Sequence, residues 1–452
     1  MGPLDDTICA LSTPPGTGAI AIVRVSGPEA FAMVHALGGP DLNAVRDRKA
    51  ELVKLADEEG PIDEAVITLY KGPRSYTGQD VAEIAVHGSP YIQQRLLGAL
   101  TDHGARLARP GEFTMRAFLD RKLDLSQAEA VADLIASSGR AAHKLAMQQL
   151  RGGYSKRIEE LRQRLVDLCA LVELELDFSE EDVEFAKRDD LLALLDTLLH
   201  TCTELIASFR YGNAIKQGVP VAILGAPNSG KSTLLNALLE EDRAIVSDIP
   251  GTTRDTVEDT ISLNGVLFRF IDTAGLRDTS DTIEQLGIDR SYKKAGEAQV
   301  VLLLGDATTL SAGALRTQAD LLRQRIGAGA TIMPVLNKVD LPDASPGGDD
   351  PLRISARNGT GLNALKDMLL DHVNTLPHDQ SDIVVTNARH VAALKQAVSG
   401  LEDARAGVLN GISGELLAID LRRAQHHLGE ITGRITSDDI LGSIFGRFCI
   451  GK

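Results

Sequence analysis

Positive charge is in short supply in this sequence. Its 452 residues include 47 lysines and arginines but 63 aspartates and glutamates, which gives a formal net charge of −16 at pH 7. Affinity for nucleic acids rests largely on Lys and Arg side chains that neutralise phosphates, so this balance excludes a broad phosphate-binding surface. A protein of this charge that handles nucleic acid would have to use a local patch or a basic partner.

Cysteine is also scarce. The four cysteines, Cys9, Cys169, Cys202 and Cys449, lie far apart and form no CxxC pair. This spacing argues against a zinc site and fits a reducing cytoplasm. Cys202 lies on an apolar helical stripe, so we expect it to pack in a core.

Targeting signals and long apolar runs are missing as well. No run reaches the ~18–20 residues needed to cross a bilayer. The segment MGPLDDT has neither the basic region nor the apolar core of a signal peptide, and Asp6 breaks the myristoylation pattern. The sequence therefore predicts a soluble, cytoplasmic protein with no membrane association, long enough for roughly three domains.

Residues 1–119 are predicted to form an α+β domain. Short β-like runs at 19–27, 64–70 and 80–88 have period-2 or continuous β-branched character. The segments 28–37 and 90–100 are typical of helices that carry proline at the first position.

Residues 120–217 and 378–452 are predicted to form one discontinuous helical domain. Apolar residues recur every three or four positions on either side of an acidic segment, and again after residue 390. They are Ile158, Leu161, Leu165, Leu168, Val172 and Leu176; Leu191, Leu195, Leu198, Cys202, Leu205 and Phe209; and Val391, Leu394, Val398, Leu401 and Val408, with the charged Arg405 at the same spacing. We expect the first two helices to pack antiparallel and another domain to be inserted into this one.

The inserted residues 218–377 alternate short apolar strands with helical segments, which predicts a doubly wound parallel α/β sheet. Asn264 and Gly265 lie between two β-like runs and indicate a hairpin, which would add an antiparallel edge strand.

A phosphate-binding loop begins this inserted domain. Residues 225–232, GAPNSGKS, match GxxxxGK[ST] between a strand and a helix. Backbone N–H groups would face a β-phosphate, Lys231 would reach the β and γ oxygens, and the Ser232 hydroxyl could ligate Mg²⁺. The nucleotide-binding residues expected here are Asn228, Ser229, Gly230, Lys231, Ser232 and Thr233.

Three further motifs follow in the order of a GTPase. The first could sense the γ-phosphate and consists of Asp272, Thr273, Ala274 and Gly275. The second could read guanine through the Asp340 carboxylate and consists of Asn337, Lys338, Val339 and Asp340. The third could lie behind the base and consists of Ser355, Ala356 and Arg357. Between the phosphate loop and Asp272 lies a switch-loop candidate, formed by Ser247, Asp248, Ile249, Pro250, Gly251, Thr252 and Thr253. Thr253 would be a second Mg²⁺ ligand. Each motif alone is an ordinary strand-end turn, but together they predict a P-loop GTPase.

One position departs from many small GTPases. Leu276 follows the DTAG motif where a water-orienting glutamine is common, and leucine cannot orient water. Arg277 and Glu284 are the nearby candidates for a catalytic role, and for each of them a solvated switch charge is the alternative.

The whole chain resembles the MnmE/TrmE family of tRNA-modification GTPases. The resemblance runs through residues 13–27, 75–88 and 109–135, the GTPase motifs and the terminal Cys-Ile-Gly-Lys. It implies a folate-binding N-terminal domain, a helical domain and an inserted GTPase. It also implies a homodimer that works with an MnmG/GidA-type flavoprotein to place an aminomethyl-type group on carbon 5 of the wobble uridine of certain tRNAs.

The resemblance also implies roles for single residues. Asn228 would be a K⁺ ligand, completed by backbone oxygens near Ser247, Ile249 and Thr252, and Glu284 would orient the hydrolytic water. Arg24, Glu83, Lys122 and Lys452 would bind 5-formyltetrahydrofolate or a related folate; without the resemblance each is an ordinary surface charge. Where the family usually has His-Gly-Gly, this chain has His87-Gly88-Ser89.

The tail residues RFCIGK raise a choice between a lipid anchor, a reactive thiol and simple packing. Gly451 and Lys452 fit a prenylation box poorly. The resemblance places the tail beside the folate site and makes Cys449 a candidate reactive thiol, with packing of the last turn as the alternative.

Two other functions stay open at this point. A regulatory or ribosome-assembly GTPase would bind no folate, and a folate-dependent transferase with a vestigial GTPase would not turn over GTP. Both leave more of the N-terminal and C-terminal motifs unexplained.

Overall fold

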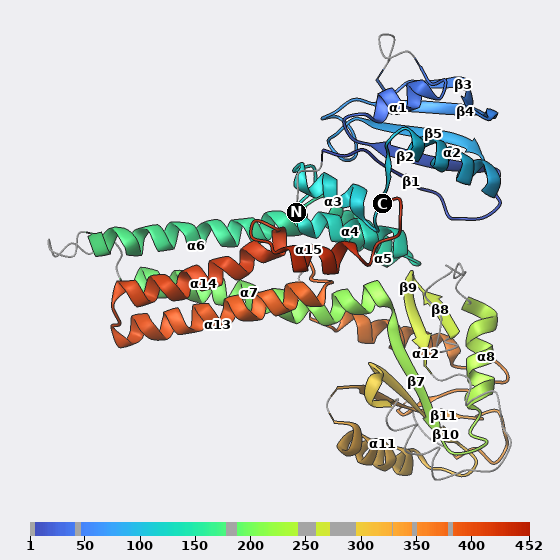
Figure 1. The fold of residues 1–452 in the computed structure, drawn as a ribbon. Helices are drawn as coiled ribbons and strands as arrows, with labels where there is room; N and C mark the ends of the chain where they lie inside the picture. The colour runs from blue at the N-terminus through green and yellow to red at the C-terminus, as the bar shows by residue number, and fades with distance from the viewer. Residues whose placement is uncertain are drawn as a thin grey trace. The chain divides into compact units, whose positions relative to one another are not determined.

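The structure is a computed structural model, and it describes residues 5–40, 47–177, 188–242, 259–271, 295–327, 329–345, 350–377 and 383–452 (Figure 1). These residues group into two compact units. The first contains Met1–Ala132, Gln149–Ala170 and Gln425–Lys452, and the second contains Asp133–Gln148 and Leu171–Ala424. The sequence-based division at 119, 217 and 377 remains a prediction.

The first unit contains a six-stranded sheet. Its strands are β1 (Ile8–Leu11), β2 (Ile20–Ser26), β3 (Ala50–Asp57), β4 (Gly60–Tyr70), β5 (Val81–His87) and β6 (Arg106–Leu107). They lie in the order β3-β4-β5-β2-β1-β6, and only the β1–β6 pair is parallel. The strands predicted at 19–27, 64–70 and 80–88 are therefore confirmed.

One face of this sheet forms a core with two helices, α1 (Ala30–Ala36) and α2 (Pro90–Asp102). Because successive side chains of a strand point to opposite faces, Val23 and Val25 enter this core while Arg24 points to the other face. Pro90 begins α2 as predicted. Pro28 does not begin α1, because Pro28 and Glu29 form a turn in which the Glu29 N–H donates to the Thr7 hydroxyl at 3.0 Å.

Helices complete the first unit and continue into the second. They are α3 (Glu112–Leu119), α4 (Leu125–Ala136), α5 (Arg140–Leu150), α6 (Gly153–Asp177), α7 (Arg188–Gln217), α13 (Ala388–Asn410), α14 (Gly414–Thr432) and α15 (Asp438–Phe445). Within the first unit, α15 and Phe448 pack with α3 and α4 in a small apolar core.

The apolar stripes predicted for the long helices are largely buried. On α7 they include Leu195, Leu198 and Cys202, which confirms the core position of Cys202. Helix α7 packs along α13, and Arg405 of α13 pairs with Asp196 of α7 at 2.6 Å. Although no spanning apolar run was expected, α7 is long and apolar enough to cross a membrane by length and composition, a test that core helices also pass.

The second unit contains the α/β sheet. Its strands are β7 (Val219–Gly225), β8 (Asp259–Leu263), β9 (Val266–Phe270), β10 (Val300–Asp306), β11 (Thr331–Asn337) and β12 (Leu352–Arg353), in the order β12-β11-β10-β7-β9-β8. Helices α8 (Lys231–Asp242), α11 (Ala312–Ile326) and α12 (Leu362–Asn374) accompany it.

All neighbouring strands of this sheet are parallel except β8 and β9. Strand β8 is the antiparallel edge strand that Asn264-Gly265 predicted. Asn264 and Gly265 have φ of 49° and 83°, the left-handed values that a tight two-residue hairpin requires.

Candidate functional site

The phosphate-loop candidate joins the end of β7 to the start of α8 (Figure 1). Gly230 has φ of +94°, and a Cβ there would collide with the side-chain amide of Asn337. A Cβ at Gly225 would collide with the carbonyl oxygen of Leu304 in the neighbouring strand. Both positions therefore require glycine, and the backbone of the loop is fixed against the sheet.

Asn337 holds three of the predicted motifs together. Its side-chain N–H₂ donates to the carbonyl oxygen of Ser229 at 2.9 Å, and its side-chain oxygen accepts the backbone N–H of Ala356 at 2.9 Å. Only 2% of Asn337 is exposed. One buried amide thus ties the phosphate loop, the NKVD motif and the Ser355-Ala356 turn into one site.

The outer residues of this site lie at the surface. Asp340 and Arg357 are exposed, whereas Ser355 is buried and its N–H donates to the carbonyl oxygen of Thr360 at 2.9 Å. Val339 donates its N–H to Ile354. Strands β11 and β12 thus bring the two base-reading segments together, and the Asp340 carboxylate can reach a ligand from solvent.

The phosphate loop itself has the polar groups that an anion needs. The Lys231 ammonium donates to the carbonyl oxygens of Gly225 and Ala226, both at 2.9 Å. Burial lowers the pKa of Lys231, because desolvation disfavours the charged form. The Ser229 hydroxyl is buried and has no hydrogen-bond partner among the residues that the structure describes. A phosphate group would supply a partner for that hydroxyl and the opposite charge for Lys231.

Much of the predicted catalytic machinery lies outside the described residues. This holds for Ser247, Asp248, Ile249, Pro250, Gly251, Thr252, Thr253, Asp272, Thr273, Ala274, Gly275, Leu276, Arg277 and Glu284. Of the proposed ion ligands, Ser232 is described in the first turn of α8, beside Thr233, and Asn228 is exposed in the loop with φ of 62°.

A second candidate site lies on the face of the first sheet that α1 and α2 leave uncovered. Arg24 of β2 and Glu83 of β5 are register partners. The Arg24 Nε and Nη2 atoms donate to Glu83 Oε1 at 3.1 and 2.8 Å. The hydroxyl of Tyr70 donates to the other carboxylate oxygen at 3.4 Å. Burial, and then the Glu83 charge, raises the pKa of Tyr70, so its hydroxyl stays a donor.

Aromatic rings enclose the cation of this pair. The Arg24 guanidinium carbon lies 5.2 Å from the centre of the Tyr76 ring and 5.6 Å from that of Phe113. Both distances are within the range of cation–π attraction. Because only 15% of the Arg24 side chain is exposed, the guanidinium is held in place before any ligand arrives.

The C-terminal tail reaches the same place. The Gly451 carbonyl oxygen accepts the Ser12 hydroxyl at 3.2 Å and Arg24 Nη1 at 3.4 Å. The Phe113 N–H donates to the Lys452 carbonyl oxygen at 3.2 Å. Gly451 has φ of +92°, and a Cβ there would collide with the Leu11 backbone. We call Arg24, Glu83, Tyr70 and Gly451 the tail-lined site.

Lys122, predicted as a folate ligand, and Cys449, predicted as a reactive thiol, make different contacts from the residues above. Lys122 is exposed, and its ammonium donates to the Pro73 carbonyl oxygen at 2.8 Å. Among the described contacts it does not meet the tail-lined site. Cys449 is the only exposed cysteine, because the other three are buried. Its backbone oxygen accepts the Gly111 N–H at 3.4 Å.

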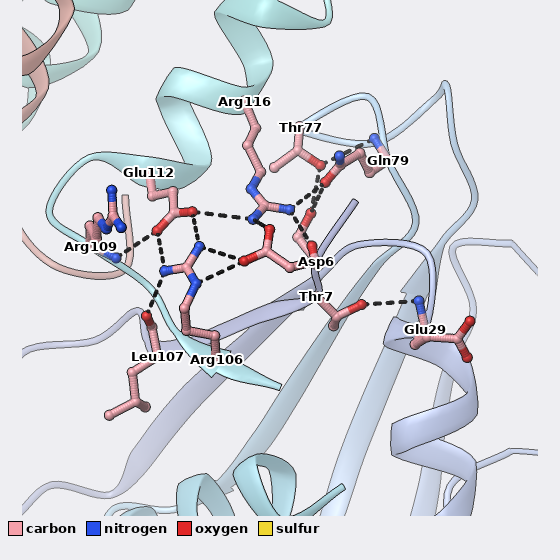
Figure 2. A network of polar contacts seen from close by, with 11 residues as sticks. Asp6, Thr7, Glu29, Thr77, Gln79, Arg106, Leu107, Arg109, Glu112 and Arg116 are labelled. Atoms are coloured by element: carbon pink, nitrogen blue, oxygen red, sulfur yellow. Dashed lines mark hydrogen bonds and ion pairs between the residues drawn. The ribbon is translucent and has the colours of Figure 1, made fainter. Parts of the chain in front are cut away.

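A buried ion network fixes α3, on which the tail rests (Figure 2). Glu112 accepts Arg106 Nη1 and Nη2 at 3.0 and 2.5 Å and Arg116 Nη2 at 3.2 Å. Arg116 also donates to Asp6 Oδ1 at 2.6 Å and to Gln79 at 3.0 Å. Arg116 is fully buried, and Glu112 is 2% exposed. Each of these two buried charges is tolerated in the core because a residue of opposite charge neutralises it.

This network was not predicted from the sequence, and neither were the contacts of Tyr70, Tyr76, Phe113 and Ser12. One signal was present: Glu112 and Arg116 are four residues apart, the spacing that places oppositely charged side chains together on a helix. The others meet only through strand register and long-range packing.

The His87-Gly88-Ser89 departure from the family pattern is accommodated locally. Gly88 makes the close approach, because a Cβ there would collide with the Gly18 backbone and the Gly18 N–H donates to the Gly88 carbonyl oxygen at 2.9 Å. Ser89 has an ordinary extended conformation at the N-cap of α2. A second glycine is not needed at position 89.

Two protein-family models match the chain. The model described as the MnmE helical domain matches residues 125–449, and the model described as the GTP-binding protein TrmE N-terminus matches residues 7–122. The chain belongs to the MnmE family of tRNA modification GTPases. Together the two family models cover the nucleotide site and the residues of the tail-lined site other than Gly451.

Similar proteins are found at full length. The tRNA modification GTPase MnmE of Porphyromonas gingivalis is 49% identical over 477 residues, covering 99% of this chain and 98% of that protein. The protein of the same name in Christiangramia forsetii is 48% identical over 472 residues, covering 99% and 100%. Among solved structures, the G domain of the T. maritima FeoB iron transporter is 26% identical and covers 34% of this chain and 98% of that one. Its TM-score of 0.24 is too low to support a conclusion about the fold.

Proposed function

We propose that this GTPase drives the modification of tRNA at carbon 5 of the wobble uridine, with a folate as the one-carbon donor and an MnmG/GidA-type flavoprotein as partner. We further propose that it acts as a homodimer in the cytoplasm. The observation that carries this proposal is the tail-lined site: a fixed Arg24–Glu83 pair, closed by the tail, in the same chain as a phosphate loop.

The proposal that this chain binds GTP rests on the hydrogen bonds that Asn337 makes with Ser229 and Ala356. Lys231 and the loop N–H groups would bind the phosphates, and Asp340 would accept the two N–H groups of a guanine edge. Ser232 and Thr253 would hold Mg²⁺, which neutralises phosphate charge when bound. The buried Ser229 hydroxyl and the glycines of the loop fit such a ligand.

The hydrolytic step is assigned to residues around Leu276. Glu284 would hold the attacking water and accept its proton, because the leucine cannot. K⁺ bound by Asn228 and by backbone oxygens of Ser247, Ile249 and Thr252 would supply positive charge between the phosphates. We expect GTP turnover in KCl to exceed that in NaCl at matched ionic strength, and Asn228→Ala to remove the difference while GTP still binds. Equal turnover in the two salts would rule out the K⁺ site.

The folate half rests on chemical fit. Glu83 offers a carboxylate for the N–H groups of a pterin, and Tyr76 and Phe113 offer apolar surface for its ring. Arg24 and Lys452, with Lys122 nearer the surface, offer cations for carbonyl or carboxylate groups. Because Arg24 already neutralises Glu83, a ligand would share the carboxylate with Arg24 and Tyr70. This arrangement favours a polar, planar ligand over a simple anion.

Nucleoside analysis of tRNA tests the whole proposal. Cells that lack the protein should lose the modified wobble uridine, and the wild-type chain should restore it. Restoration by Glu83→Gln with unimpaired folate binding would contradict the folate assignment. Normal modification without the protein would favour a regulatory GTPase, and modification without any GTP turnover would favour a folate transferase.

A further inference from the structure

Lys338 is held in an unusual way at the edge of the nucleotide site. It follows Asn337 at the end of β11 and has φ of 66°, a left-handed conformation that few residues other than glycine adopt. Such a conformation is strained and persists only where the surrounding structure imposes it. The Lys338 side chain is in turn held by a carboxylate on the neighbouring strand.

That carboxylate belongs to Asp306, the last residue of β10 and the register partner of Asn337. The Lys338 ammonium donates to Asp306 Oδ2 at 2.6 Å. Asp306 Oδ1 accepts both the N–H and the hydroxyl of Thr308, at 2.9 and 2.7 Å. Both oxygens of the carboxylate therefore have partners, so Asp306 cannot turn away from Lys338 without losing hydrogen bonds.

The hydrogen bonds of Asp306 stabilise the charged form of its carboxylate. Burial alone would raise the pKa of Asp306, but the hydrogen bonds from Lys338 and Thr308 outweigh burial and keep the pKa below its usual value. The pair is only partly exposed, 30% for Lys338 and 17% for Asp306. It is thus better shielded from solvent than an ordinary surface ion pair.

We propose that Asp306 is a positioning residue for guanine-nucleotide binding, acting through Lys338. This inference rests on the proposed nucleotide site. Lys338 lies between Asn337, which holds the phosphate loop, and Asp340, which is assigned to the base. By anchoring the ammonium to the end of β10, Asp306 restricts the conformations that the Lys338 stem can adopt. The stem is then ordered before the nucleotide binds, so less conformational entropy is lost on binding.

Nucleotide titration of Asp306→Asn tests this role. Asparagine keeps the volume and one oxygen for Thr308 but removes the charge that holds Lys338. We expect the Kd for GTP and for GDP to rise by the same factor, about tenfold, which corresponds to about 1.4 kcal/mol. KM should rise with kcat unchanged, because the pair acts on bound nucleotide in the ground state and the transition state alike.

Three comparisons make the test specific. Asp320→Asn removes an exposed carboxylate that pairs with Arg323 on α11 and should leave both affinities unchanged. Inorganic tripolyphosphate, used as a competitor, should bind Asp306→Asn as it binds the wild type, since it has no base. In a Lys338→Met background, Asp306→Asn should have little further effect, because its action passes through Lys338.

Different results of these titrations would overturn the role of Asp306 and the proposed function. Unchanged GTP affinity in Asp306→Asn would overturn the inference, and so would an equal loss in the Lys338→Met background. A matching loss of tripolyphosphate binding would assign Asp306 to the fold of the loop instead, which also overturns it. Failure of the wild-type chain to bind GTP would overturn the proposed function.

Discussion

Replacing Glu112 by glutamine should loosen the part of the first unit that carries the tail. Four donors meet this carboxylate: two from Arg106, one from Arg116 and the Arg109 backbone N–H at 2.8 Å. In Glu112→Gln, two guanidinium groups would remain with Asp6 as their single carboxylate. Removing one partner of a buried pair typically costs about 3–5 kcal/mol. We take the lower figure, about 3 kcal/mol, because Arg106 is 38% exposed and solvent screens its share.

Amide hydrogen exchange is the suitable assay, because a chain of two compact units need not unfold in one step. A local loss of about 3 kcal/mol should speed exchange in residues 111–119 and 449–452 by roughly 150-fold. Glu159→Gln is the matched control: it removes the partner of Arg162 in the same unit, but that pair is more exposed and should be worth less than about 1 kcal/mol. If the two variants exchanged at the same rate, the network would not stabilise α3 as argued.

The same network predicts a dependence on pH. Burial would raise the pKa of Glu112, but the bonds from Arg106, the Arg109 N–H and Arg116 outweigh it, and the pKa lies below its usual value of 4.5. A carboxylate with a lowered folded-state pKa contributes stability above its unfolded-state pKa, and this contribution disappears as the pH falls through the folded-state value. The wild type should therefore lose protection of residues 111–119 below about pH 4, whereas Glu112→Gln should lose less over the same range.

Substitutions at three further positions test the nucleotide site and the C-terminal tail. Gly451→Ala should displace the tail from Arg24 and reduce tRNA modification strongly while GTP turnover stays near wild type; normal modified-nucleoside content would show that the tail contact is dispensable. Asp340→Asn should shift nucleotide preference from GTP towards XTP, measured with fluorescent analogues, and unchanged GTP affinity would disprove the guanine assignment. Cys449→Ser should abolish modification and spare K⁺-stimulated hydrolysis if the thiol reacts, whereas normal modification in both Cys449→Ser and Cys449→Ala would leave the thiol without a chemical role.

Local sequence signals predicted the nucleotide unit well. The phosphate loop is defined by residues next to one another, and Asn264-Gly265 requires left-handed backbone angles that only a tight hairpin supplies. Strand β3 was missed, because three of the eight residues in its segment AELVKLAD are charged and Leu55 is its one buried residue. An edge strand of this kind carries no strong apolar pattern.

The tail-lined site could not be derived from local patterns. Arg24 and Glu83 are 59 residues apart, and their contact depends on the register between β2 and β5. Ser12 and Gly451 are 439 residues apart. Family resemblance did point to Arg24, Glu83 and Lys452, and the structure brings these together through the tail. Resemblance also pointed to Lys122, whose ammonium contacts Pro73 instead. Tyr70 and Tyr76 carried no signal, because a tyrosine in a strand or turn is most often a packing residue.

The division of the chain into two units also affects how the protein is made. The first unit combines Met1–Ala132 with Gln425–Lys452, so on a ribosome its opening residues must wait for 320 more residues to be added. At the usual 5–20 residues per second this delay is roughly 15–60 s. During it, α3 has been made but lacks α15 and Phe448, its apolar partners in the finished unit. The nucleotide-binding unit is complete by residue 424 and can fold first, and the tail-lined site is the last part of the molecule to form.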